Sequence, residues 1–206
     1  MRRDDAGAGT DAKAEAKADA GALPASFFTA PVAAVARALI GTTLLVDGVG
    51  GMVVETEAYD RADPASHSFR GPTPRNAAMF GPPGHAYVYR SYGIHWCLNL
   101  VCGAEPGAAV LIRALDPAFG LDAMHSRRGG LPVRDLCRGP GRLCQALGIT
   151  DALNGRRVDE APFLLRPRTA EPVIATGPRI GISQGVETPW RFGLAGSRLL
   201  SRPMRG

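Results

Sequence analysis

Two short segments of the chain combine residue types that could do chemistry. Residues 53–59 read Val-Val-Glu-Thr-Glu-Ala-Tyr, and residues 87–99 read Tyr-Val-Tyr-Arg-Ser-Tyr-Gly-Ile-His-Trp-Cys-Leu-Asn. A carboxylate can activate a water molecule, and aromatic rings can hold a flat base or wedge open a base stack. The combination indicates an enzyme that works on a nucleobase.

Two carboxylates stand inside an apolar run. Glu55, Glu57 and Tyr59 alternate and would share one face of a strand. Because a buried charge is costly unless it is paired, two interpretations are open. One is an edge strand with a solvated face, and the other is a pocket carboxylate that acts as a general base. Arg113, in the equally apolar run 110–114, is a candidate partner for one glutamate.

The second segment places aromatic and amide side chains on a strand–turn–strand unit. Tyr87 and Tyr89 would share a strand face, and Tyr92 precedes Gly93 in the turn. An exposed turn aromatic is typical of a binding element, although the tyrosines could also fill one end of a core. Asn99 lies in an apolar strand, where its amide must find hydrogen-bond partners.

Composition favours one globular domain. The chain has 206 residues, 45% of them hydrophobic, with no apolar stretch near the ~18 residues of a membrane span and no signal peptide. We therefore expect a cytoplasmic protein, and as a separate expectation we take it to be a monomer. Residues 1–25 contain four basic and five acidic residues and almost no apolar bulk, so we expect a disordered tail before a domain over 26–206.

Charge and cysteine content bear on partners and cofactors. The expected domain carries 20 basic and 14 acidic residues, which favours a polyanionic partner. Both lysines, Lys13 and Lys17, lie in the tail, so arginine replaces lysine throughout the domain, either for phosphate binding or through codon composition. The four cysteines have loose spacings that favour buried thiols over a zinc site, and we expect no metal or other cofactor.

Local patterns predict an α+β fold in a single compact domain, with a mixed, mostly antiparallel curved sheet, flanking helices and a protruding β-hairpin. A loop over residues 60–84 carries His67. Helices are predicted at 32–40, 117–126 and 142–147. Strands are predicted at 42–46, 52–59, 86–90, 94–102, 108–115, 163–165, 173–175 and 191–194, with an Asp-Gly hairpin signal at 47–48.

Taken together, these segments resemble the alkyladenine (3-methyladenine) DNA glycosylase family of mammals and many bacteria, from about residue 27 to residue 200. The resemblance rests on many ordered matches, which are 54–59, 66–68, 73–76, 79–80, 83–84, 87–89, 92–93, 97–99, 110–115 and 143–147. It implies a sheet similar to the RNA-binding C-terminal domains of formyltransferases. It also implies hydrolysis of the N-glycosidic bond of a damaged purine in duplex DNA.

The resemblance also implies roles for single residues. Glu57 matches the catalytic glutamate that deprotonates the attacking water, and Arg113 matches an arginine that helps to hold this water. Tyr92 matches the tyrosine that fills the gap left by the extruded nucleotide. The remaining matches are Tyr59, His67 and Tyr89 as walls around the flipped base, Asn99 at the pocket floor, and Arg75 and Arg142 as DNA contacts, the latter beside the 139–141 turn.

Substrates and competing functions stay open at this stage. The family covers 3-methyladenine, 7-methylguanine, hypoxanthine and ethenoadenine, and the lysine-free domain predicts base release without strand-cleaving lyase chemistry. The alternatives are a non-catalytic nucleic-acid-binding module, a sugar hydrolase that uses Glu55 and Glu57 as a carboxylate pair, and a zinc protein that uses all four cysteines.

Overall fold

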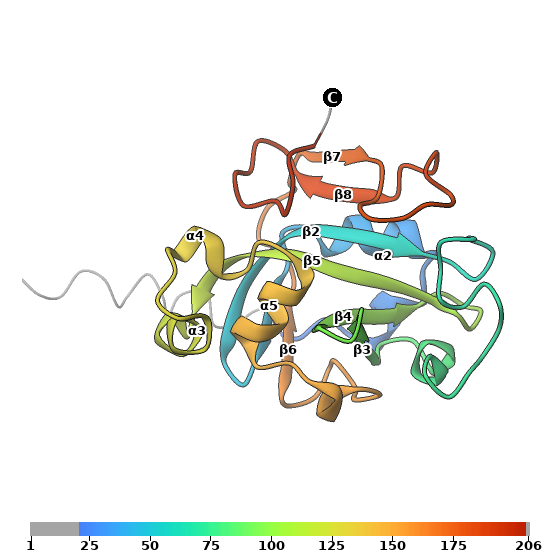
Figure 1. Cartoon of the computed structure of the whole chain (residues 1–206), viewed down its shortest axis with the longest axis horizontal. Helices are drawn as coiled ribbons and strands as arrows, with labels where there is room; N and C mark the ends of the chain where they lie inside the picture. The colour runs from blue at the N-terminus through green and yellow to red at the C-terminus, as the bar shows by residue number, and fades with distance from the viewer. Residues whose placement is uncertain (1–20, 205–206) are drawn as a thin grey trace, which may run out of the picture.

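The computed structural model describes residues 21–204 of the 206-residue chain (Figure 1). The expected tail, 1–25, therefore lies mostly outside the described residues. Within its last five residues, Leu23 is 7% exposed and packs in the core. Its backbone N–H donates to the Leu165 carbonyl at 2.8 Å. Leu23 is thus part of the folded domain.

One eight-stranded sheet organises the domain. Every strand pair is antiparallel, and the order is β3-β4-β5-β2-β1-β6, with β8 attached to β2 and β7 attached to β8. The predicted α+β class with a mostly antiparallel sheet is confirmed. The strands are β1 (Thr43–Val46), β2 (Val49–Tyr59), β3 (Ala86–Ser91), β4 (His95–Cys102), β5 (Ala108–Phe119), β6 (Phe163–Arg166), β7 (Ile174–Gly177) and β8 (Arg191–Leu194).

Strand β2 is the centre of the sheet. Asp47 and Gly48 form the predicted turn before it, with φ of 48° and 76°, as a two-residue hairpin requires. The first part of β2 pairs with β1, its last part pairs with β8, and its length runs along β5. Glu55 and Glu57 therefore lie in a central strand and have no exposed surface. The edge-strand interpretation is wrong.

The two faces of the sheet have different uses. Leu98 and Ile112 point into the main core, where Val35 and Leu143 pack from the helices. The side chains that alternate with them, such as Asn99, point to the other face, as the two-residue period of a strand dictates.

The helices are α2 (Val32–Leu39), α3 (Leu121–Arg128), α4 (Val133–Leu136) and α5 (Pro140–Leu147), and the 3-10 turns are η1 (Ala25–Thr29), η2 (Ala77–Phe80) and η3 (Asp151–Leu153).

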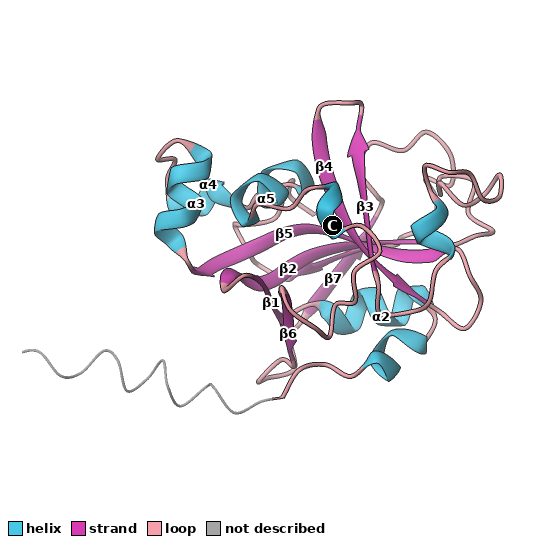
Figure 2. Cartoon of the chain, turned by 90° about the horizontal axis from the view of Figure 1, so that it is seen from below, coloured by secondary structure: helices cyan, strands magenta, loops and turns pink. Residues whose placement is uncertain are grey.

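Strands β3 and β4 form the predicted hairpin, which stands out from the body of the domain (Figure 2). Its turn uses Tyr92 at φ 50° and Gly93 at φ 69°. Left-handed backbone is uncommon for a bulky residue, so the turn holds Tyr92 at a conformational cost. The tyrosine ring is 86% exposed.

The structure corrects the predicted helix at 117–126. Strand β5 continues through Pro117 to Phe119, and α3 begins only at Leu121. A side chain at Gly51 would lie 1.9 Å from the Asp116 carbonyl oxygen, so glycine in β2 permits the close approach that extends the strand. The structure also adds the four-residue helix α4 within the arginine-rich stretch. None of the helices within residues 21–204 has the length and apolarity to cross a membrane.

Candidate active site

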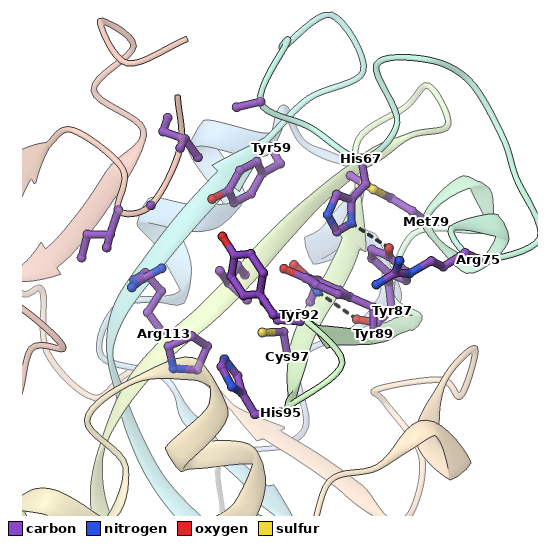
Figure 3. Close-up of a pocket in the computed structure, with 18 of the residues that line it drawn as sticks. Tyr59, His67, Arg75, Met79, Tyr87, Tyr89, Tyr92, His95, Cys97 and Arg113 are labelled. Carbon is purple, nitrogen blue, oxygen red and sulfur yellow. Dashed lines mark hydrogen bonds between the residues drawn. The ribbon is translucent and has the colours of Figure 1, made fainter. Parts of the chain in front are cut away.

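A cavity of about 670 Å³ opens on the face of the sheet opposite the main core (Figure 3). Strands β2 to β5 supply its base, and the 60–84 loop and residues 180–182 supply its rim. The structure brings seven of the predicted site residues to its lining, namely Tyr59, His67, Arg75, Tyr89, Tyr92, Asn99 and Arg113.

Aromatic rings form one wall of the cavity. The Tyr89 ring stacks on Tyr87, with centroids 5.4 Å apart, and meets the His67 ring edge-on at 4.5 Å. His67 Nδ1 lies 3.0 Å from the Tyr87 hydroxyl. Burial raises the pKa of Tyr87 to about 12 and that of Tyr89 further, so both phenols stay neutral. Partial burial, with the nearby Arg75 charge, lowers the pKa of His67.

Asn99 lies on the neighbouring part of the cavity lining and is 5% exposed. Its side-chain Nδ2 donates to the Tyr87 carbonyl at 3.0 Å, which fixes the orientation of the amide. The partner that a buried asparagine needs is therefore a backbone carbonyl of the paired strand β3.

Glu57 lies directly behind this lining. Its Oε1 accepts from the Ile180 backbone N–H at 2.7 Å, and its Oε2 accepts from the Tyr59 hydroxyl at 2.8 Å and from Arg113 Nη1 at 2.9 Å. All three donors line the cavity, whereas Glu57 does not and has no exposed surface. Burial and the neighbouring Glu57 charge raise the pKa of Tyr59, so its hydroxyl remains a donor.

Arg113 contacts both glutamates, whereas its place in an apolar strand predicted a pairing with one of them. Its Nε lies 3.2 Å from Glu55 Oε1, in addition to the Glu57 contact. Burial lowers the pKa of Arg113, but the Glu57 and Glu55 charges outweigh this effect and raise it overall. Glu55 also accepts from Arg191 Nε at 2.7 Å and from the Ser201 hydroxyl at 2.8 Å. Because Glu55 is held in this way away from the cavity, the two glutamates do not form an open carboxylate pair.

The two arginines predicted to contact DNA differ in their position relative to the cavity. Arg75 is exposed and donates to the Arg90 carbonyl at 3.0 Å, beside the β3–β4 hairpin that carries Tyr92. Arg142 is exposed at the start of α5 but does not line the cavity, although Pro140 of the same helix does. The structure therefore separates Arg142 from the cavity itself.

Sequence reasoning missed the 179–182 segment. Ile180 supplies the amide that holds Glu57, and Arg179 is buried against Tyr59. This stretch has no periodic pattern, and its contacts with Ala58 and Glu57 of β2 span 121 and 123 positions of the chain. The only local sign that this stretch is buried was a single arginine, Arg179, between Pro178 and the apolar Ile180.

The four cysteines are free and buried, as predicted. Burial raises their pKa values, and for Cys102 and Cys137 to about 12, so all four stay as thiols. Across residues 21–204 we find no group of three or more His, Cys, Asp or Glu side chains that could hold a metal ion.

Comparisons with known proteins define the class. The family described as methylpurine-DNA glycosylase matches residues 26–198. Bacterial relatives named "Putative 3-methyladenine DNA glycosylase" occur in Granulibacter bethesdensis, at 65% identity over 87% of both chains, and in Nitrosospira multiformis, at 62% identity over 88% of this chain and 95% of the relative. A third, in Rhodopseudomonas palustris, is 61% identical over 89% of this chain and 91% of its own.

The chain therefore belongs to the methylpurine-DNA glycosylase family. This membership confirms the predicted resemblance and the predicted enzyme class, a DNA glycosylase that hydrolyses N-glycosyl bonds.

Proposed function

We propose that this enzyme flips an alkylated purine, 3-methyladenine first among the candidates, out of duplex DNA and hydrolyses its N-glycosidic bond with a water activated by Glu57. It would act as a monomer in the cytoplasm. The observation that carries the proposal is the position of Glu57, a fully buried carboxylate held by three donors that all line an aromatic cavity.

The cavity, at about 670 Å³, is large enough to admit a purine, and its aromatic lining suits a flat base. Tyr59, His67 and Tyr89 present aromatic surface around it, and stacking on such rings returns ~1–3 kcal/mol per base. Flipping costs a few kcal/mol, and least for a damaged base in a weak pair. A neutral His67 adds no positive charge beside a cationic base such as 3-methyladenine. Asn99 is proposed to discriminate among purines by contact with the base edge.

The bond change is a displacement of the base by water. The water oxygen bonds to C1′ of the sugar, the N-glycosidic bond breaks toward the base nitrogen, and Glu57 takes the released proton. Oε2 of Glu57 already accepts two hydrogen bonds, whereas Oε1 accepts one from Ile180 and keeps a lone pair for this proton. Because no atom of Glu57 is exposed, a water reaches Oε1 only when a covering side chain moves.

Substitution of Glu57 tests the proposal most directly. Duplexes that each carry one lesion are incubated with enzyme in EDTA, and abasic sites are revealed with alkali. Wild type should release the base without cutting the strand, because no lysine lies in the domain. The Glu57→Gln variant should lose at least about a hundredfold in single-turnover rate, the lower range for a general base, while still binding the lesion. A wild-type rate for this variant would refute the assignment.

A further inference from the structure

Arg179 is a buried arginine beside the proposed base pocket that has no part in the chemistry just described. Its side chain has no exposed surface, and its two terminal nitrogens form a forked ion pair with Asp63, whose side chain is 4% exposed. Nη1 also donates to the Ala58 carbonyl at 2.9 Å, and Nη2 donates to the Gly185 carbonyl at 3.2 Å. These contacts tie the turn after β2 to the segment that follows β7.

The same guanidinium packs on aromatic rings. Its Cζ lies 4.7 Å from the centre of the Tyr59 ring and 5.6 Å from the centre of the Trp190 ring. Nε of Arg179 has no hydrogen-bond partner within residues 21–204, so the guanidinium is held by its terminal nitrogens and by the aromatic rings near Cζ. A cation over an aromatic ring contributes ~0.5–2 kcal/mol when it is desolvated. Arg179 therefore restrains Tyr59.

The residue after Arg179 reaches the carboxylate. The Ile180 N–H donates to Glu57 Oε1 at 2.7 Å, which is the oxygen that the proposed mechanism leaves free for the proton. With Arg179 anchored to Asp63, the position of this amide is set by the same contacts that restrain Tyr59. One arginine thus restrains both the aromatic wall and the general base.

We propose that Arg179 is a positioning residue for base excision, which acts through Tyr59 and the Ile180 amide and touches neither DNA nor the base. The inference rests on the proposed function of Glu57. It predicts a specific separation of effects: changes at Arg179 slow the chemical step and leave the affinity for undamaged DNA unchanged, because the buried guanidinium cannot reach a bound duplex.

The test compares Arg179→Lys with the exposed control Arg37→Lys on α2. Lysine keeps the charge next to Asp63 but loses the planar fork and the ring contact. We expect roughly a tenfold loss in single-turnover release of the lesion base that the wild type excises from a short duplex, unchanged affinity for undamaged DNA, and no change for Arg37→Lys. A folded Arg179→Lys protein with the wild-type rate, or with weakened binding to undamaged DNA, would overturn the proposal.

A double-mutant cycle tests whether Arg179 affects the excision rate through Tyr59. If Arg179 acts through Tyr59, Arg179→Lys should cost much less in a Tyr59→Leu background than in wild type, because the restrained ring is already gone. Equal rate losses in the two backgrounds would show that Arg179 does not act through Tyr59, and would overturn the proposal as stated.

Amide hydrogen exchange covers the case in which Arg179→Lys does not fold. In the wild type, the Ile180 amide should exchange slowly, and in Asp63→Asn it should exchange faster while core strand amides stay protected. Fast exchange of the Ile180 amide in wild type would overturn the proposal without any variant. Absence of base release by wild type would instead refute the proposed function, and the exchange result would still decide whether Arg179 holds this segment.

Discussion

Arg113 and Glu57 form a buried ion pair across two neighbouring central strands, with Nη1 of the arginine 2.9 Å from Oε2 of the glutamate. The second carboxylate of β2, Glu55, contacts Nε of the same arginine. Two buried negative charges therefore meet one positive charge, and Arg191 supplies the second positive charge at Glu55. The four charges balance, which explains how an apolar sheet accommodates them.

Removal of Arg113 should destabilise the fold as well as the reaction. Arg113→Met removes the positive charge beside Glu57 and leaves Glu55 with Arg191 alone, and breaking one partner of a buried pair costs ~3–5 kcal/mol. Urea unfolding should show this loss. Arg113→Lys keeps one charge but cannot contact both glutamates, so it should lie between wild type and Arg113→Met. Equal stability of Arg113→Met and wild type would contradict the role of the pair.

Substitutions of Glu55 and of Glu57 should differ in how much they reduce excision. Glu55→Gln leaves Arg113 and Arg191 with one buried carboxylate fewer, so we expect a lower melting temperature and a partial loss of excision. Glu57→Gln should show the larger loss of excision. Melting curves and single-turnover rates on the same preparations check both expectations. Equal loss of excision in the two variants, with both folded, would favour a carboxylate pair instead.

Local signals predicted much of the fold. The Asp47-Gly48 turn and the hairpin around Tyr92 depend on residues next to each other in the chain, so short-range rules were sufficient. The boundary between β5 and α3 was predicted incorrectly, because the helical spacing of Leu121 and Met124 was extended back to Pro117, where a central strand usually ends. Here Pro117 pairs with Gly51, and the absence of a side chain there allows β5 to continue.

For the site as well, contacts within the strands were predicted and contacts between distant loops were not. Alternation placed Glu55, Glu57 and Tyr59 on one face, and the charge of Arg113 in an apolar strand indicated it as the partner of one glutamate, whereas it contacts both. The Arg179–Asp63 pair joins residues 116 positions apart in two loops without periodicity. No local pattern encodes such a contact, because it depends on where the sheet brings the two loops.

The titration of His67 gives a pH-dependent prediction. Partial burial and the Arg75 charge lower its pKa, so the unfolded chain, with a pKa near 6.5, binds the proton more readily than the folded protein. Stability is then unaffected above pH ~6.5 and falls as pH drops toward the folded-state pKa. The loss should be small, because His67 as a residue is still open to solvent, which screens the effect of its partial burial. NMR titration should give His67 a pKa below 6.5, and Arg75→Gln should raise this pKa. A pKa of His67 above 6.5 in the wild type would contradict the prediction.

Two truncations should define the start of the domain. Residues 1–20 are polar and almost without apolar bulk, so deleting them should leave single-turnover excision on short duplexes unchanged. Deleting residues 1–24 also removes Leu23, whose side chain is in the core and whose N–H bonds to Leu165. This longer truncation should lower the melting temperature. Equal melting temperatures for the two proteins would show that Leu23 contributes nothing to stability.

Substitution of Tyr92 should change base flipping without changing the stability of the fold. Tyr92 is 86% exposed at the hairpin tip, so Tyr92→Ala should leave the melting temperature nearly unchanged, because little packing is lost and alanine keeps the Cβ that disfavours the left-handed turn position. If the ring fills the space of the extruded nucleotide, the variant should lower the flipped fraction for every lesion, and least for those in unstable pairs. Ile94→Ala is the matched control, because Ile94 is 74% exposed at the same tip. The fluorescence of ethenoadenine reports flipping directly. An unchanged flipped fraction in a stable Tyr92→Ala protein would rule out the wedge.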